Sequence, residues 1–116
     1  MKRIFDRKIS DRIIKGYDAE QIKSLLSNIR EIDRFEFYYY RPHSKSPTES
    51  KKLKNQPAEE VLSFLNSHFT ESSNFYVEIQ EKVYKSGKIE VIVRGMTLEG
   101  EITKIAVLNS KKHEAI

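Results

Sequence analysis

The residue types best suited to chemistry follow one another between positions 38 and 54, in the stretch YYYRPHSKSPTESKKLK. A ribonuclease that works without metal needs a general base, a general acid and cations that stabilise the phosphorane. Histidine, tyrosine, lysine and arginine can fill these roles. His43 is therefore the one weak candidate for a catalytic residue. Because no diagnostic string of residues accompanies it, we expect a binding protein rather than an enzyme.

The same stretch also suits the binding of RNA or DNA without catalysis. Basic side chains contact phosphates, and tyrosine rings stack on exposed bases. The candidate nucleic-acid-binding residues are Arg41, Lys45, Lys51, Lys52, Lys54, Tyr38 and Tyr40. Lysine-rich loops are also common as plain solvated surface, so both interpretations stay open.

Other kinds of site find no support in the sequence. His43, His68 and His113 stand far apart with no second ligand at metal spacing, and there is no cysteine. The isolated glycines form no phosphate-binding loop, and no serine lies in a nucleophile elbow. We therefore expect neither a metal nor a cofactor.

The charges divide the chain into an acidic body and two basic segments. The 116 residues carry a formal net charge of +4. In residues 41–56 the basic side chains oppose Glu49 alone, and in residues 1–15 they oppose only Asp6 and Asp11. Such polarity can steer an anionic partner. No apolar run is long enough to span a bilayer, and the charged start does not resemble a signal peptide, so we expect a cytoplasmic protein.

Two stretches have the apolar spacing of amphipathic helices. Asp18 can cap a helix over 18–32, and Pro57 suits the first position of a second helix over 57–69. Ser10 to Gly16 is typical of a short helical turn, which a strand at 3–5 could precede. Residues 41–56, with Pro42 and Pro47, are predicted to form a long basic loop.

Four stretches have the pattern of strands. Residues 34–40 alternate as an aromatic strand, and 75–84, 89–97 and 101–108 form an antiparallel meander. A three-residue loop with Gly87 in the left-handed region aligns Val77 and Ile79 with Val91 and Val93. A two-residue turn at Glu99-Gly100 then places Ile102, Ala106 and Leu108 on the same face. The tail from 109 to 116 is predicted to fray.

The opposite face of this meander is too apolar for plain solvent. The N-terminal segment, the stretch 35–40 or another chain could cover it. For the last case, a homodimer or a protein partner, the candidate interface residues are Ile92, Met96, Leu98, Ile105 and Val107.

These patterns predict one α+β domain over residues 1–116. Its two amphipathic helices pack on one face of a small antiparallel sheet, built from the three C-terminal meander strands and the aromatic strand. The favoured function is a small nucleic-acid-associated module that uses the basic loop and exposed tyrosines. The alternative is a protein-binding inhibitor, immunity or adaptor module that uses the apolar outer face, and a metal-free ribonuclease is the third hypothesis.

Overall fold

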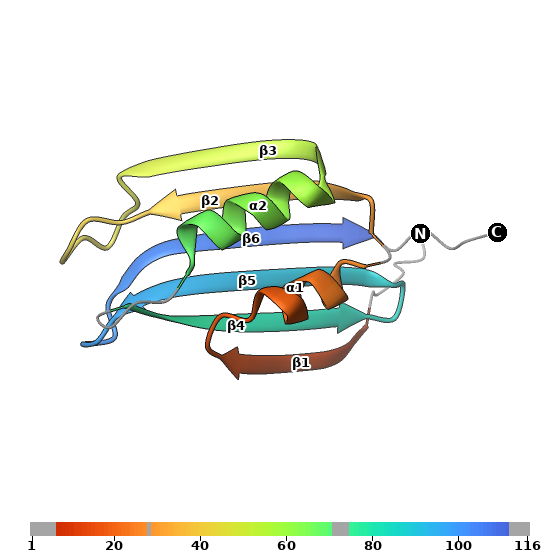
Figure 1. Cartoon of the computed structure of the whole chain (residues 1–116), viewed down its shortest axis with the longest axis horizontal. Coiled ribbons are helices and arrows are strands. Elements are labelled where there is room, and N and C mark those ends of the chain that lie inside the picture. The colour runs from red at the N-terminus through yellow and green to blue at the C-terminus, as the bar shows by residue number, and fades with distance from the viewer. Residues whose placement is uncertain (1–6, 28, 71–74, 112–116) are drawn as a thin grey trace, which may run out of the picture.

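The computed structural model describes residues 7–27, 29–70 and 75–111. They form one six-stranded antiparallel sheet, in the order β1-β4-β5-β6-β2-β3, and two helices (Figure 1). In chain order the elements are β1 (Lys8–Lys15), α1 (Ala19–Leu25), β2 (Glu31–Tyr39), β3 (Glu49–Pro57), α2 (Ala58–His68), β4 (Phe75–Tyr84), β5 (Lys88–Thr97) and β6 (Ile102–Lys111). The mixed helix-and-sheet class is as predicted, but the sheet has two more strands than the sequence indicated.

The hairpin of β4 and β5 has the predicted register. Val77 lies opposite Gly95, Ile79 opposite Val93 and Val83 opposite Ile89. The connecting loop is Lys85 to Gly87, and Gly87 adopts a φ of 94°, which glycine tolerates without steric cost. The three-residue loop is therefore confirmed.

The turn between β5 and β6 differs from the prediction. Thr97 N–H donates to the Glu101 carbonyl and Gly100 N–H to the Thr97 carbonyl, both at 2.9 Å, so Leu98, Glu99 and Gly100 form a three-residue turn. A register shift between Gly95 and Met96 compensates for the extra residue. As a result Ala106 and Leu108 lie in the core as expected, whereas Ile102 pairs with Met96 and is 38% exposed.

The N-terminal segment is a strand and not the predicted helical turn. Residues 8–15 pair with β4, and Gly16 ends the strand at a φ of 99°. Ile14 packs against the core from this edge of the sheet. It does so as part of a strand and not as part of a helix. The predicted strand at 3–5 lies outside the described residues.

The predicted basic loop 41–56 is also mostly strand. Residues 49–57 form the outer strand β3, with Lys52 opposite Glu36 and Leu53 opposite Phe35. The prediction was wrong because an edge strand exposed on both faces needs few apolar residues, and Leu53 alone packs against the core. The loop itself shrinks to residues 40–48.

Helix α1 is shorter than the predicted 18–32, while α2 matches the second prediction closely. Asp18 caps α1 as expected, since its carboxylate accepts from the N–H groups of Glu20 and Gln21 at 3.0 and 3.3 Å. Beyond Leu25 the chain turns, and the apolar spacing continues because Ile29 and Ile32 are buried along the same layer.

The last strand is longer than predicted. Strand β6 continues to Lys111, so residues 109–111 are not frayed, and residues 112–116 lie outside the described part.

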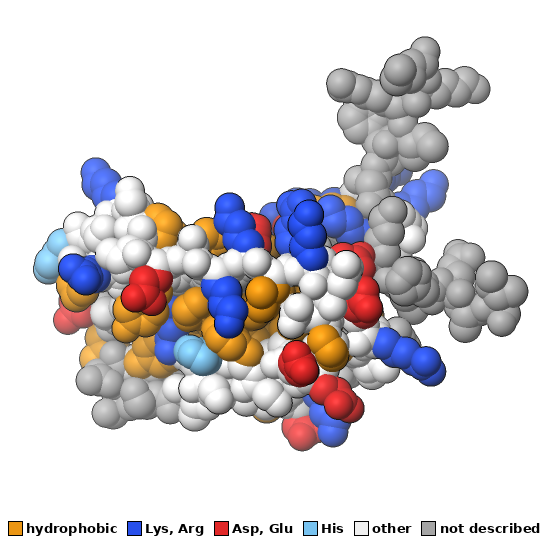
Figure 2. Space-filling view, turned by 90° about the horizontal axis from the view of Figure 1, so that it is seen from above, with side chains coloured by type: hydrophobic (Ala, Val, Ile, Leu, Met, Phe, Trp, Pro, Cys, Tyr) orange, Lys and Arg blue, Asp and Glu red, His pale blue; other side chains and the backbone are white. Residues whose placement is uncertain are grey.

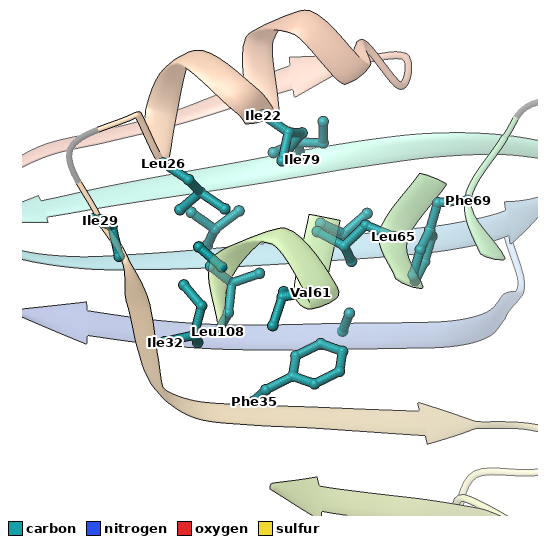
Figure 3. Close-up of a cluster of buried hydrophobic side chains, with 14 of the residues drawn as sticks. Ile22, Leu26, Ile29, Ile32, Phe35, Val61, Leu65, Phe69, Ile79 and Leu108 are labelled. Carbon is teal, nitrogen blue, oxygen red and sulfur yellow. The ribbon is translucent and has the colours of Figure 1, made fainter. Parts of the chain in front are cut away.

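Both helices lie on the same face of the sheet, α1 over β4 and β5 and α2 over β6 and β2 (Figure 1). The core fills the layer between helices and sheet. Figure 3 shows the side chains of Ile22, Val61 and Leu65 pointing toward the strands. The other side of the sheet, which we call the open face, carries no described helix or strand above it.

Candidate nucleic-acid interface on the open face

The register of the strands shows which residues lie side by side on the open face. Residues directly opposite each other in an antiparallel pair lie on the same face. One row runs from Ile13 through Gln80, Ile92, Val107 and Glu36 to Lys52, and the next ends with Ile105, Tyr38 and Ser50. The apolar centre of the sheet is thus flanked by tyrosines and charged residues.

Most of the predicted interface residues do lie on this face. Ile92, Met96, Ile105 and Val107 stand on β5 and β6 and are partly exposed. Leu98 lies in the β5–β6 turn instead and is 64% exposed. In the described structure neither the N-terminal strand nor residues 35–39 cover the face, because both are strands within the sheet.

Three cations on the β1, β4 and β5 side of the open face lie within ion-pair distance of carboxylates. Lys82 pairs with Glu90 at 3.4 Å, and Lys8 pairs with Asp11 at 2.8 Å. Arg94 lies 3.9 Å from Glu78 and also donates to Gln80 at 2.9 Å. The hydrogen bond from Gln80 and the neighbouring Lys8 lower the pKa of Asp11, so this carboxylate is held in its charged form.

The cations on β2 and β3 are not neutralised in this way. Arg34 lies opposite Lys54, and Lys52 lies two residues farther along the same face of β3. Together we call them the basic strip. Among the described residues none of the three forms an ion pair. Figure 2, seen from the β3 edge, shows Lys and Arg side chains standing along this side of the molecule.

Glu36 is the acidic side chain that lies on β2 beside the basic strip, directly opposite Lys52. Its carboxylate accepts a hydrogen bond from a neighbouring residue on the same strand. The hydroxyl of Tyr38 donates to the Glu36 carboxylate at 2.9 Å. Partial burial, followed by this hydrogen bond, raises the pKa of Tyr38, so its phenol stays neutral. Tyr38 is therefore held in place on the open face beside the basic strip.

The remaining predicted binding residues separate into two places. Lys51 lies opposite Phe37, whose ring packs on Phe64 of α2, so Lys51 stands on the helix side of the β3 edge. Arg41 and Lys45 lie in the exposed connection between β2 and β3. The structure thus brings Lys52, Lys54 and Tyr38 together and sets Lys51 apart.

A hollow of about 520 Å³ lies where this connection meets the β5–β6 turn. We call it the hairpin hollow, and its lining residues are Tyr40, His43, Ser44, Lys45, Gly100, Glu101, Ile102 and Ile105. The Nδ1 atom of His43 lies 3.2 Å from Oε1 of Glu101 across its rim. His43 adopts a φ of 63°, and its side chain is 85% exposed.

Sequence reasoning missed three residues that the structure places at this interface. Arg34 shares the face of Tyr38 by simple alternation, and it would have been found had 49–57 been recognised as its partner strand. Glu101 and Ile102 reach the hollow only because the β5–β6 turn has three residues. No local signal in the sequence distinguishes that turn from a two-residue one.

Within the described ranges no cluster of histidine and acidic side chains could hold a metal ion. No helix there has the length and apolar character needed to cross a bilayer. No protein-family model, curated protein or solved structure matches this chain.

Proposed function

We propose that the protein binds single-stranded nucleic acid along β2 and β3 on the open face of its sheet. One observation carries this proposal. Carboxylates pair with the cations Lys82 and Arg94 on β4 and β5, whereas Arg34, Lys52 and Lys54 form no ion pair among the described residues. Cations that are not held in ion pairs suit a polyanion, because phosphate contacts release bound counterions from the nucleic acid.

Tyr38 on β2 and Tyr40 directly after it favour a single strand over a duplex. Tyr38 lies on the same face as the basic strip, and Tyr40 lines the hollow at the end of the same strand. Unpaired bases can stack on such rings, while stacked bases within a duplex cannot reach them. In this arrangement the phosphates follow β3 and the bases face the centre of the sheet.

The lysines of β3 also have a purely structural use, since charged residues on an edge strand discourage association with other strands. Charge reversal separates the two roles. Lys52→Glu/Lys54→Glu keeps the edge charged, so protection against association is retained, but it repels phosphate. A matched control, Lys23→Glu/Lys85→Glu, changes the net charge equally at exposed sites away from β2 and β3.

The experiment is a fluorescence anisotropy titration with a labelled single-stranded oligonucleotide at several salt concentrations. We expect Lys52→Glu/Lys54→Glu to lower the affinity roughly tenfold or more, and to reduce the slope of log K against log salt by about 1.4 for two lost phosphate contacts. The control double variant should keep most of both. Equal loss in the two variants would reduce the effect to net charge and contradict a site on β3.

A second candidate function is the binding of a protein partner by the apolar part of the open face. The observation that favours it is the exposure of Ile13 on β1, at 56%, in the same row of the open face as the half-buried Ile92. If this candidate holds, Ile13→Asp should dissociate a dimer or complex in size-exclusion chromatography with light scattering, with unchanged thermal unfolding. A wild-type monomer that captures no partner would contradict it.

A further inference from the structure

The hairpin hollow lies at the end of β2 opposite the basic strip. Arg34 and Tyr40 are six residues apart along an extended strand, which corresponds to roughly 20 Å. A single strand of nucleic acid that follows the basic strip therefore reaches the hollow after a few nucleotides. The two features belong to one continuous path on the open face.

The lining of the hollow is suited to a flat, uncharged ring. Ile102 and Ile105 supply apolar side chains, and Ile102 is 38% exposed although it is a large apolar residue. Tyr40 supplies an aromatic ring in the same lining. Large exposed apolar side chains that gather in a concave surface are typical of binding sites.

The rim of the hollow is suited to the phosphate that accompanies such a ring. Lys45 provides a cation, and its side chain forms no ion pair in the described structure. The carboxylate of Glu101 would repel a phosphate, but His43 lies 3.2 Å from it and opposes its charge when protonated. The apolar lining and the lysine at the rim together match a nucleotide, with its base inside and its phosphate outside beside Lys45.

We propose that the hairpin hollow takes one unpaired nucleobase of the bound strand, stacked on Tyr40, with the adjoining phosphate on Lys45. This inference rests on the proposed function, because the rest of the strand is held by Arg34, Lys52 and Lys54. It adds a specific role for the base at a position where the basic strip supplies only phosphate contacts.

The test compares two probes of equal length, about eight nucleotides: an oligothymidylate and the same sugar-phosphate chain without bases. The wild-type protein should bind the oligothymidylate about tenfold or more tightly than the abasic chain, as expected for base stacking. Tyr40→Ala should lower this difference several-fold, the rest coming from stacking on Tyr38, and should change the affinity for the abasic chain much less. Tyr40→Trp, which keeps a stacking ring, should retain the difference.

The matched control is Tyr39→Ala. Tyr39 is 46% exposed, but it lies opposite Lys104 on the helix side of the sheet, so its loss should change neither affinity. If Tyr40→Ala does not fold by circular dichroism, Ile102→Glu serves instead. It places a carboxylate in the hollow on a side chain that is already exposed, and it should weaken binding of the base-bearing probe.

The outcomes for the inference and for the proposed function are distinguishable. Salt-dependent binding with equal affinity for the two probes would overturn the base site and leave the phosphate-binding strip standing. An undiminished preference for bases in Tyr40→Ala and in Ile102→Glu would also overturn it. Failure of the wild-type protein to bind either probe at low salt would overturn the proposed function together with the inference.

Discussion

His43 and Glu101 connect two turns that are far apart in the sequence, with 3.2 Å between Nδ1 of the imidazole and Oε1 of the carboxylate. The contact ties the loop between β2 and β3 to the turn between β5 and β6, across the hairpin hollow. Both side chains are substantially exposed, at 85% and 43%. Such a pair orders a loop more than it stabilises the fold.

Glu101→Gln should therefore change the free energy of unfolding by less than about 1 kcal/mol, measured by urea denaturation. The same substitution should speed amide hydrogen exchange in residues 41–47, because the loop loses its tether. Glu99→Gln removes a carboxylate from the same turn without touching His43, and it should leave exchange unchanged. Equal exchange in all three proteins would show that the pair does not order the loop.

The ion pair of Arg12 and Glu81 should have a larger effect on stability. Glu81 is only 8% exposed and accepts from Nε and Nη2 of Arg12 at 3.2 and 3.0 Å, which ties β1 to β4 on the helix side. Arg12→Met leaves this carboxylate without its partner and should cost about 1–3 kcal/mol in urea denaturation.

The control for this ion pair is Lys8→Met, which breaks the exposed pair with Asp11 on the same strand. It should cost less than about 1 kcal/mol. Equal costs for the two variants would mean that the burial of Glu81 contributes nothing.

Position 95 requires a glycine because the ring of Phe75 lies over it. A Cβ atom at this position would come within 2.6 and 2.7 Å of two ring atoms of Phe75. Replacing a glycine inside a strand by alanine normally stabilises a protein. Here the steric conflict with Phe75 reverses the sign of that effect on stability. Gly95→Ala should destabilise the protein by about 1–3 kcal/mol in thermal unfolding. In the double variant with Phe75→Leu the two costs should be less than additive; full additivity would contradict the contact.

Tyr17 should titrate at unusually high pH. Burial raises the pKa of Tyr17 to about 12, and its hydroxyl donates to Asn66 at 2.5 Å. Since the unfolded chain releases this proton near the ordinary tyrosine pKa of 10.0, the stability that Tyr17 contributes is complete below that pH and falls as the pH rises toward 12. Tyr17→Phe should remove the phenolate absorbance step near pH 12. An unchanged absorbance titration would contradict the assignment.

Where one face of an element must be buried, the sequence was enough to predict the element. The β4–β5 register followed from the alternation of Val77 and Ile79 against Val91 and Val93, because one slip would expose all of them. Asp18 and Pro57 marked the helix starts for a different reason, since the side-chain cap of aspartate and the fixed φ of proline act locally.

The edges of the sheet could not be predicted in this way. Strand β3 exposes lysines on both faces and keeps only Leu53 against the core, so its sequence resembles a loop. Arg12 on β1 forms an ion pair with Glu81, 69 residues away, and no local sequence pattern predicts that contact. The candidate site depends on both kinds of element. Tyr38 was found from its strand, but the position of Arg34 beside Lys54 depends on strand pairing, and the position of Ile102 in the hollow depends on a turn length.

Chemical-shift mapping shows directly whether nucleic acid lies on β2 and β3 of the open face. A ¹⁵N-labelled sample is titrated with the oligothymidylate at low salt. We expect the largest amide shift changes in β2, in β3 and in the turn at residues 98–101, with little change in α1 and α2. Largest changes in the helices or in β1, or no change at saturating oligonucleotide, would contradict it.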